Sequence, residues 1–237
     1  SLSLSNANFG LRAGTATVFE LSGGTLTANI GGFASLNAAS TMVQYAGVGA
    51  SVAANTTLSV GSTSYTFAKA IAANTVAFQL KGLSANVSDF VTLSGDVGFA
   101  KSGNTLVAVG SNVSAQLSAG SAASLSLSNA NFGLRAGTAT VFELTGGTLT
   151  ASIGGFASLS AASTMVQYAG AGASVSAGTT LGVGSTSYTF AKAIAANTVA
   201  FQLKGLSANV SDFVTLSGDV GFAKSGNTLV AVGSNVS

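Results

Sequence analysis

The sequence contains no cysteine, histidine, proline or tryptophan. Without Cys and His it has no thiol nucleophile, no imidazole general base and none of the common zinc ligand sets. A Ser-His-Asp triad cannot be assembled, so the abundant serines are not expected to act as nucleophiles. These absences predict that the protein is not an enzyme and has no catalytic and no cofactor-binding residues.

Charge is also scarce. Only 6% of the residues are charged, compared with about a quarter in typical soluble domains. The net charge of +2 comes from eight basic and six acidic residues that do not cluster, so we expect no nucleic-acid partner. No apolar run approaches the ~18 residues of a transmembrane helix, and the start lacks a signal-peptide pattern. We expect no membrane insertion, and any export signal is expected elsewhere in a longer chain.

What the sequence does contain is repetition. Residues 1–114 recur as residues 124–237, so the period is 123 residues. The copies differ by exchanges among small residues, at Ser22/Thr145, Asn29/Ser152, Asn37/Ser160, Val48/Ala171, Ala53/Ser176, Asn55/Gly178 and Ser59/Gly182. We expect a first repeat over 1–123 and a second over 124–237, truncated at its C-terminal end. Neighbouring repeats of a longer parent chain are then the expected partners.

Within each repeat, apolar and polar residues alternate in short runs, as in Leu26–Ile30 and Val76–Leu80. This period of two is typical of half-buried strands. Gly, Asn and Ser interrupt the runs every few residues, where turns and corners would need them. The pattern predicts an all-β fold. Recurring phenylalanines are expected to form its core, at Phe9, Phe19, Phe33, Phe78, Phe90 and Phe99.

A weaker repeat of about 30 to 35 residues lies inside the period, with units starting near Val18, Ala77 and Val107. Residues 48–73 form an excursion, in which Leu58–Val60 and Ser64–Phe67 flank a Gly-Ser-Thr turn and predict a β-hairpin. The following alanines favour a short helical turn before Asn74. We therefore predict a tandem-repeat β-solenoid with roughly 33-residue coils and a protruding hairpin in each 123-residue period. The alternative is two tandem β-sandwich or barrel domains.

The carboxylates offer one weak metal site. Asp89 and Asp96 flank a predicted strand and recur as Asp212 and Asp219, and calcium prefers carboxylate oxygens. Calcium sites usually gather several carboxylates, however, and the nonapeptide of calcium-binding β-rolls is missing. The competing interpretation, which we favour, is that Asp89 and Asp96 are turn residues that bind nearby backbone amides. The other acidic residues, Glu20 and Glu143, are given no role.

Four basic residues recur once per period, at Arg12, Lys69, Lys81 and Lys101. They could form a charge ladder for glycans or an anionic surface. We favour the simpler interpretation that isolated charges keep a nearly neutral surface soluble and block the pairing of edge strands.

The segment Phe90–Gly103, continuing to Leu106–Val109 and preceded by Gly82–Val87, resembles repeats of giant bacterial secreted and surface proteins of the type I-secreted, RTX-adhesin-like kind. The resemblance covers both periods. It implies an extracellular or cell-surface location and a role as a spacer or adhesive stalk. It assigns no functional residue.

Three functions follow as hypotheses. The first is a non-catalytic structural segment that acts as a rigid spacer or stalk in a giant bacterial surface or secreted protein. The alternative is an adhesive module that binds glycan or another surface, with an unknown ligand. A further alternative is a self-assembling fibrous β protein, because unpaired strands at the ends of a repeat array can promote end-to-end self-association.

Overall fold

The structure is a computed structural model that describes residues 1–211 and 213–237. It confirms the prediction of an all-β protein, with β-strands connected by turns. The strands of the first repeat are β1 Leu2–Arg12, β2 Val18–Ile30, β3 Ala34–Ala38, β4 Ser40–Ala46, β5 Thr57–Val60, β6 Thr63–Thr66, β7 Thr75–Val87, β8 Val91–Ser102 and β9 Thr105–Ser118. Those of the second repeat are β10 Ala123–Ala136, β11 Val141–Ile153, β12 Ala157–Ala161, β13 Ser163–Ala169, β14 Thr180–Val183, β15 Thr186–Thr189, β16 Thr198–Val210, β17 Val214–Ser225 and β18 Thr228–Ser234.

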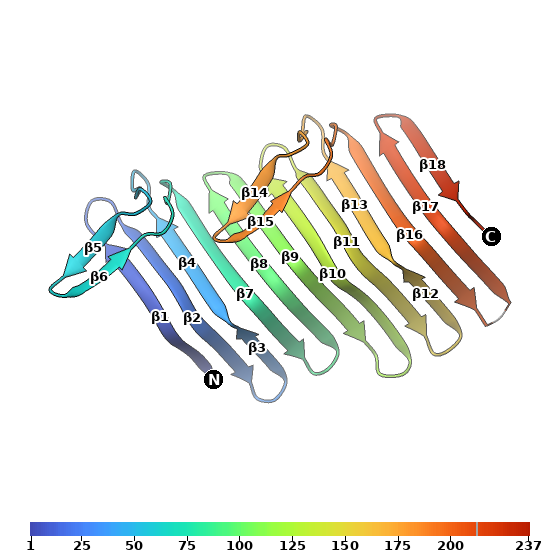
Figure 1. The fold of residues 1–237 in the computed structure, drawn as a ribbon, viewed down its shortest axis with the longest axis horizontal. Coiled ribbons are helices and arrows are strands. Elements are labelled where there is room, and N and C mark those ends of the chain that lie inside the picture. The colour runs from blue at the N-terminus through green and yellow to red at the C-terminus, as the bar shows by residue number, and fades with distance from the viewer. Residues whose placement is uncertain (212) are drawn as a thin grey trace.

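Most of these strands form one antiparallel sheet in the order of the chain, from β1 at one edge to β18 at the other. The strands β3 and β4, separated only by Ala39, share one position between β2 and β7, and β12 and β13 do the same in the second repeat. Figure 1 shows the strands side by side in one extended layer, coloured in sequence order from edge to edge. Each 123-residue period therefore adds six strand positions to the sheet.

The predicted solenoid is not confirmed. Stacked coils would join strands about 33 residues apart, whereas the long strands here pair antiparallel with their neighbours along the chain. The two-domain alternative is not confirmed either, because β9 pairs with β10 and carries the sheet from one repeat into the next. Each unit of the weaker repeat of about 30 to 35 residues corresponds to two neighbouring strand positions of the sheet with their turns.

Several glycines that were expected at corners lie inside long strands instead. Gly23 in β2, Gly82 in β7 and Gly95 in β8 have positive φ angles of 73°, 57° and 121°. The register between β7 and β8 shifts between Leu80 and Leu83, which marks a bulge, and pairing then continues on both sides. A single left-handed residue can thus interrupt the alternation of a strand without ending it. The sequence therefore suggested strands about half as long as those observed.

The predicted hairpin is confirmed in both repeats, as β5–β6 and β14–β15. Each hairpin belongs to a longer excursion, which we call the first arm (residues 47–74) and the second arm (residues 170–197). Figure 1 shows both arms on the same face of the sheet, with the first hairpin over β1 and the second over the middle of the sheet. No helical turn precedes Asn74, because Ile71 forms a bridge with Val52.

The two larger core clusters lie between the arms and the sheet. The cluster in the first repeat gathers residues around Phe67 of the arm and Val18 of the sheet. A larger cluster around Phe190 includes residues of both repeats, such as Val109 and Val141. The predicted phenylalanine core is wrong for most of its members, because Phe9, Phe33, Phe78 and Phe90 are exposed. They lie where no arm covers them.

Candidate functional site: the arms and the two edges of the sheet

The predicted calcium ligands do not form a cluster. Asp96 lies inside β8, where its carboxylate accepts a hydrogen bond of 2.8 Å from the backbone N–H of Gly82, whereas Asp89 lies in the turn before β8 and bonds with Asn86. Asp219 likewise accepts from Gly205, at 2.7 Å. Asp212 lies outside the described residues. In the described part of the chain, no three acidic residues lie close enough together to hold a metal ion.

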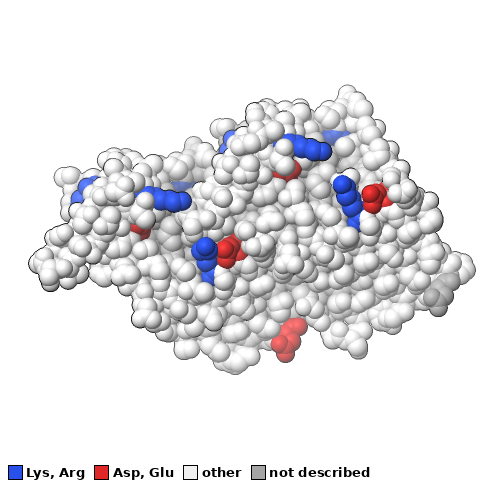
Figure 2. Space-filling view, in the orientation of Figure 1, with Lys and Arg blue, Asp and Glu red and all other residues white. Residues whose placement is uncertain are grey.

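The predicted basic residues serve the arms and the sheet. The guanidinium group of Arg12 donates a hydrogen bond of 2.7 Å to the carbonyl of Ser51 in the first arm, and Arg135 donates to Ser174 in the second. Lys81 lies 3.9 Å from Asp96, a partly exposed pair of little energetic weight. Figure 2 shows how few charged side chains this face of the molecule carries.

A buried hydrogen-bond network attaches the first arm to the sheet. Glu20 on β2 is buried, and its carboxylate accepts hydrogen bonds from the amide of Gln44 on β4 and from the hydroxyl of Tyr65 on β6, the latter at 2.7 Å. Because the phenol has one proton to donate, Ser22 donates its own proton to the Tyr65 oxygen at 3.0 Å. The network thus joins two sheet strands to the arm. Such bonds to a charged group are stronger than neutral ones.

The second arm repeats this network. The carboxylate of Glu143 accepts from Gln167 and from the hydroxyl of Tyr188, both at 2.6 Å. The hydroxyl of Thr145, which replaces Ser22, lies 3.2 Å from the Tyr188 hydroxyl. The Ser22/Thr145 exchange therefore preserves the hydroxyl that the network uses.

Each tyrosine ring lies against a glycine of the sheet. A Cβ atom on Gly10 in β1 would overlap the ring of Tyr65, and one on Gly133 in β10 would overlap the ring of Tyr188. Only a residue without a side chain lets the arm approach this closely. Burial first, and then the nearby Glu20 carboxylate, raise the pKa of Tyr65 to about 12, against a smaller lowering by the hydrogen bond with Ser22. The pKa of Tyr188 is raised for the same two reasons.

The second arm also reaches across the boundary to the first repeat. The side-chain amide of Gln79 on β7 donates a hydrogen bond of 2.6 Å to the hydroxyl of Thr186, and Lys69 of the first arm donates to the carbonyl of Gly184. Val183 lies on Gly98 of β8, where an added Cβ atom would be 2.8 Å from the valine Cβ. The second arm is therefore held by both repeats.

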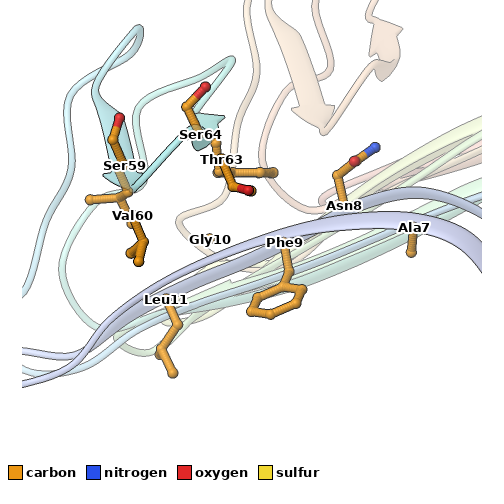
Figure 3. A pocket seen from close by; sticks show the side chains of 11 residues that line it. Ala7, Asn8, Phe9, Gly10, Leu11, Ser59, Val60, Thr63 and Ser64 are labelled. Atoms are coloured by element: carbon orange, nitrogen blue, oxygen red, sulfur yellow. The ribbon is translucent and has the colours of Figure 1, made fainter.

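The first arm has no repeat on its outer side within the described residues. Val60, the counterpart of Val183, is 85% exposed, whereas Val183 is 3% exposed. Between this arm and β1 lies an open groove of about 510 Å³, lined by residues such as Asn8, Val60 and Thr63. Figure 3 shows Asn8 on the arm side of β1, while Phe9 and Leu11 point to the opposite side. We call β1 together with the first arm the head edge.

The other end of the sheet, the tail edge, is β18 with the adjoining faces of β16 and β17. In the part of the chain that the structure describes, β18 pairs only with β17. Val232 on β18 is 60% exposed, whereas its counterpart Val109 on β9 is fully buried under the second arm. No charged residue lies on β18. The predicted protection of edges by charge is thus missing at this strand.

The face of the sheet opposite the arms carries aromatic side chains. Phe78 and Phe99 stack with ring centroids 5.0 Å apart, and Phe201 and Phe222 stack at 5.9 Å in the second repeat. Phe78, Phe201 and Phe222 are exposed. Alternation along β7 places Phe78 on the opposite side from Gln79, which contacts the second arm.

Sequence reasoning found the hairpin but missed the residues that hold it. Phe19 was expected to point into the core, which would leave the next residue, Glu20, exposed. The structure buries Glu20 instead, because the arm covers the other face of β2. A signal was present in the sequence: Glu20 is the only glutamate of its repeat and interrupts an otherwise uncharged strand.

Comparisons of the chain with protein-family models, curated proteins and solved structures found no match. In the described residues there is no helix that is long and apolar enough to cross a membrane.

Proposed function

We propose that this chain is a non-catalytic structural segment, which acts as a rigid extracellular spacer or stalk in a giant bacterial surface or secreted protein. The observation that carries the proposal is the joint between the two repeats. There, β9 pairs with β10, and the second arm lies over strands of both repeats. A joint that is both hydrogen-bonded and covered by an arm resists bending, as a spacer requires.

The extracellular location rests on the resemblance of Phe90–Gly103 to repeats of secreted bacterial proteins and on the lack of cysteine. The same joint can be made at every boundary of a longer array, because the residues that form it recur in each copy. Length would then be set by the number of repeats.

Small-angle scattering on chains of two, three and four tandem repeats tests this function. Six strand positions per period, at about 4.8 Å each, predict that the long dimension grows by about 29 Å for every added repeat. Growth in equal steps supports a spacer. A compact, globular profile that does not lengthen with repeat number contradicts it.

The alternative function, an adhesive module for glycan or another surface, has one observation in its favour. The stacked pairs Phe78–Phe99 and Phe201–Phe222, in which all rings but that of Phe99 are exposed, offer flat aromatic faces on the side of the sheet that the arms leave open. Glycan-array and cell-binding assays of the chain and of its Phe78→Ser and Phe201→Ser variants test it. Retention that these substitutions abolish supports adhesion, and no retention of the unaltered chain removes it.

A further inference from the structure

The head edge and the tail edge match the two sides of the joint between the repeats. The head edge corresponds to β10 with the second arm, and the tail edge corresponds to β9 with the adjoining faces of β7 and β8. We propose that a second copy of this chain docks head to tail, with its β1 against β18 and its first arm over β16 and β17 of the first copy. This inference rests on the proposed structural role, and it names the partner and the interface.

The register of the internal joint fixes the register of the proposed one. Within the chain, Gly133 of β10 faces Val109 of β9, and Leu134 faces Ala108. Shifted by the period of 123 residues, these pairs place Gly10 of the second copy against Val232, and Leu11 against Ala231. In the part of the chain that the structure describes, β1 pairs only with β2 and β18 only with β17, so each strand has one side without a neighbouring strand.

The contacts that the second arm makes with the first repeat predict the contacts of the docked first arm in the same way. Val60 of the second copy would lie on Gly221, as Val183 lies on Gly98. The amide of Gln202 would then donate to Thr63, as Gln79 donates to Thr186. Lys192, which is exposed, would donate to the carbonyl at the tip of the hairpin, as Lys69 does within the chain.

The residues needed for these contacts are present. Residues 65–114 and 188–237 are identical, so the tail edge carries the same side chains as the internal joint. In the hairpins, Thr57–Thr66 and Thr180–Thr189 differ only at Ser59 and Gly182. A Cβ atom built on Gly182 meets its nearest neighbour at 3.7 Å, an ordinary contact, so a serine fits there.

The burial of matched residues favours a copy of this chain over any other occupant. Thr63 is exposed at the head edge, whereas Thr186 is 4% exposed in the joint. Leu58 is half-buried, whereas Leu181 is buried. The head edge thus presents the side chains that the joint buries. Because the two edges differ, each added copy leaves a free head and a free tail, so the association is open-ended.

Within the chain, the short β9–β10 turn links the two sides of the joint covalently, whereas two separate chains have no such link. The test must therefore reach high protein concentration, up to about 1 mM, where untethered copies approach the effective concentration of linked ones. Sedimentation velocity and small-angle scattering of the purified 237-residue chain then measure the association. We expect elongated species whose length increases with concentration.

Two single substitutions block one edge each. Val60→Asp places a carboxylate at the head edge, and Val232→Asp places one at the tail edge. Both positions are exposed in the single chain, and both become buried on docking, so each substitution should weaken association at least about 100-fold. Thr63→Arg is a second head-blocking variant. Val48→Asp is the matched control, because Val48 is as exposed as Val60 but its counterpart Ala171 stays exposed at the joint.

Mixing the two blocked variants gives the sharpest result. Val60→Asp retains a working tail and Val232→Asp a working head, so each alone stays monomeric and an equimolar mixture forms dimers that grow no further. Three results would overturn the proposal: an unaltered chain that stays monomeric up to about 1 mM, assembly that Val60→Asp and Thr63→Arg leave intact, or a mixture that remains monomeric. Linear growth of tandem-repeat chains together with a strictly monomeric 237-residue chain would sink this inference and leave the spacer function standing.

Discussion

The two arms have nearly the same sequence and very different surroundings. Both are attached to their own repeat by a tyrosine that donates to a buried glutamate, through Tyr65 and Glu20 in one arm and Tyr188 and Glu143 in the other. Within the described residues, only the second arm has another repeat beneath its hairpin tip, where Val183 is buried. Comparing the two arms therefore distinguishes the contacts that hold an arm to its own repeat from the contacts that an arm makes with the preceding repeat.

The largest expected difference is at the hairpin tip. Val183→Asp should lower the free energy of unfolding by about 3–5 kcal/mol, because it buries a carboxylate without a partner on Gly98. Val60→Asp should change it by less than about 0.5 kcal/mol, because that side chain is exposed in the single chain. Urea unfolding at low protein concentration measures both. Equal losses would show that the two tips have the same surroundings.

The tyrosines should behave alike in the two arms. Tyr65→Phe and Tyr188→Phe each remove a hydroxyl that donates to a buried carboxylate, and each should cost about 1.5–3 kcal/mol of unfolding free energy. Tyr45→Phe is the control, because Tyr45 is exposed. The same urea experiment measures all three. A cost in one arm only would mean that the networks are not equivalent.

Gly98, which lies beneath the second hairpin tip, should differ from its counterpart Gly221 at the tail edge. Gly98→Ala adds a Cβ atom 2.8 Å from that of Val183 and should cost about 1–3 kcal/mol, because the joint has no room for it. At Gly221 the nearest atom to an added Cβ is a methyl of Val232, at 3.2 Å, so Gly221→Ala should cost less. Thermal unfolding followed by circular dichroism compares them. A larger cost at Gly221 would contradict the comparison.

Alkaline pH should loosen the arms. The pKa of Tyr65 is raised from 10.0 to about 12, so its stabilising effect is complete below pH 10 and is lost as the pH rises from 10 towards 12. Tyr65 is partly accessible to solvent, and we expect this effect to be smaller than those of the substitutions above. Absorbance titration of tyrosine ionisation, with Tyr65→Phe to assign the transition, measures it. If Tyr65→Phe instead removes a transition near pH 10, the pKa of Tyr65 is not raised, which contradicts the prediction.

The smallest expected effect concerns an exchange between the arms. Asn55 and Gly178 occupy the same position with φ angles of 64° and 80°, a region that Gly and Asn adopt more readily than other residues. Gly178→Asn should therefore be nearly neutral, whereas Gly178→Ala should cost about 1 kcal/mol. Differential scanning calorimetry of both variants checks this. An alanine as well tolerated as asparagine would mean that the backbone changes its conformation there.

The sequence predicted the all-β class and the hairpin correctly, because both depend on local pattern. It did not predict the long strands, since the pattern does not distinguish a bulge at Gly82 or Gly95 from a corner. It also placed phenylalanines such as Phe78 in the core, and left Glu20 without a role. Which face of a strand is buried depends on what lies over it, and a distant arm covers the side that holds Glu20.

By itself, the sequence determined that the protein is built of β-strands, repeats every 123 residues and lacks Cys and His. Alternation, glycine placement and composition are local properties that the chain carries in any context. Only the tertiary structure decided that Val183 is buried while Val60 is exposed, and that the sheet has two complementary edges. The physical reason is that a side chain is buried only when a second surface covers it. The hairpin tip is therefore buried where a repeat lies beneath it and exposed where none does.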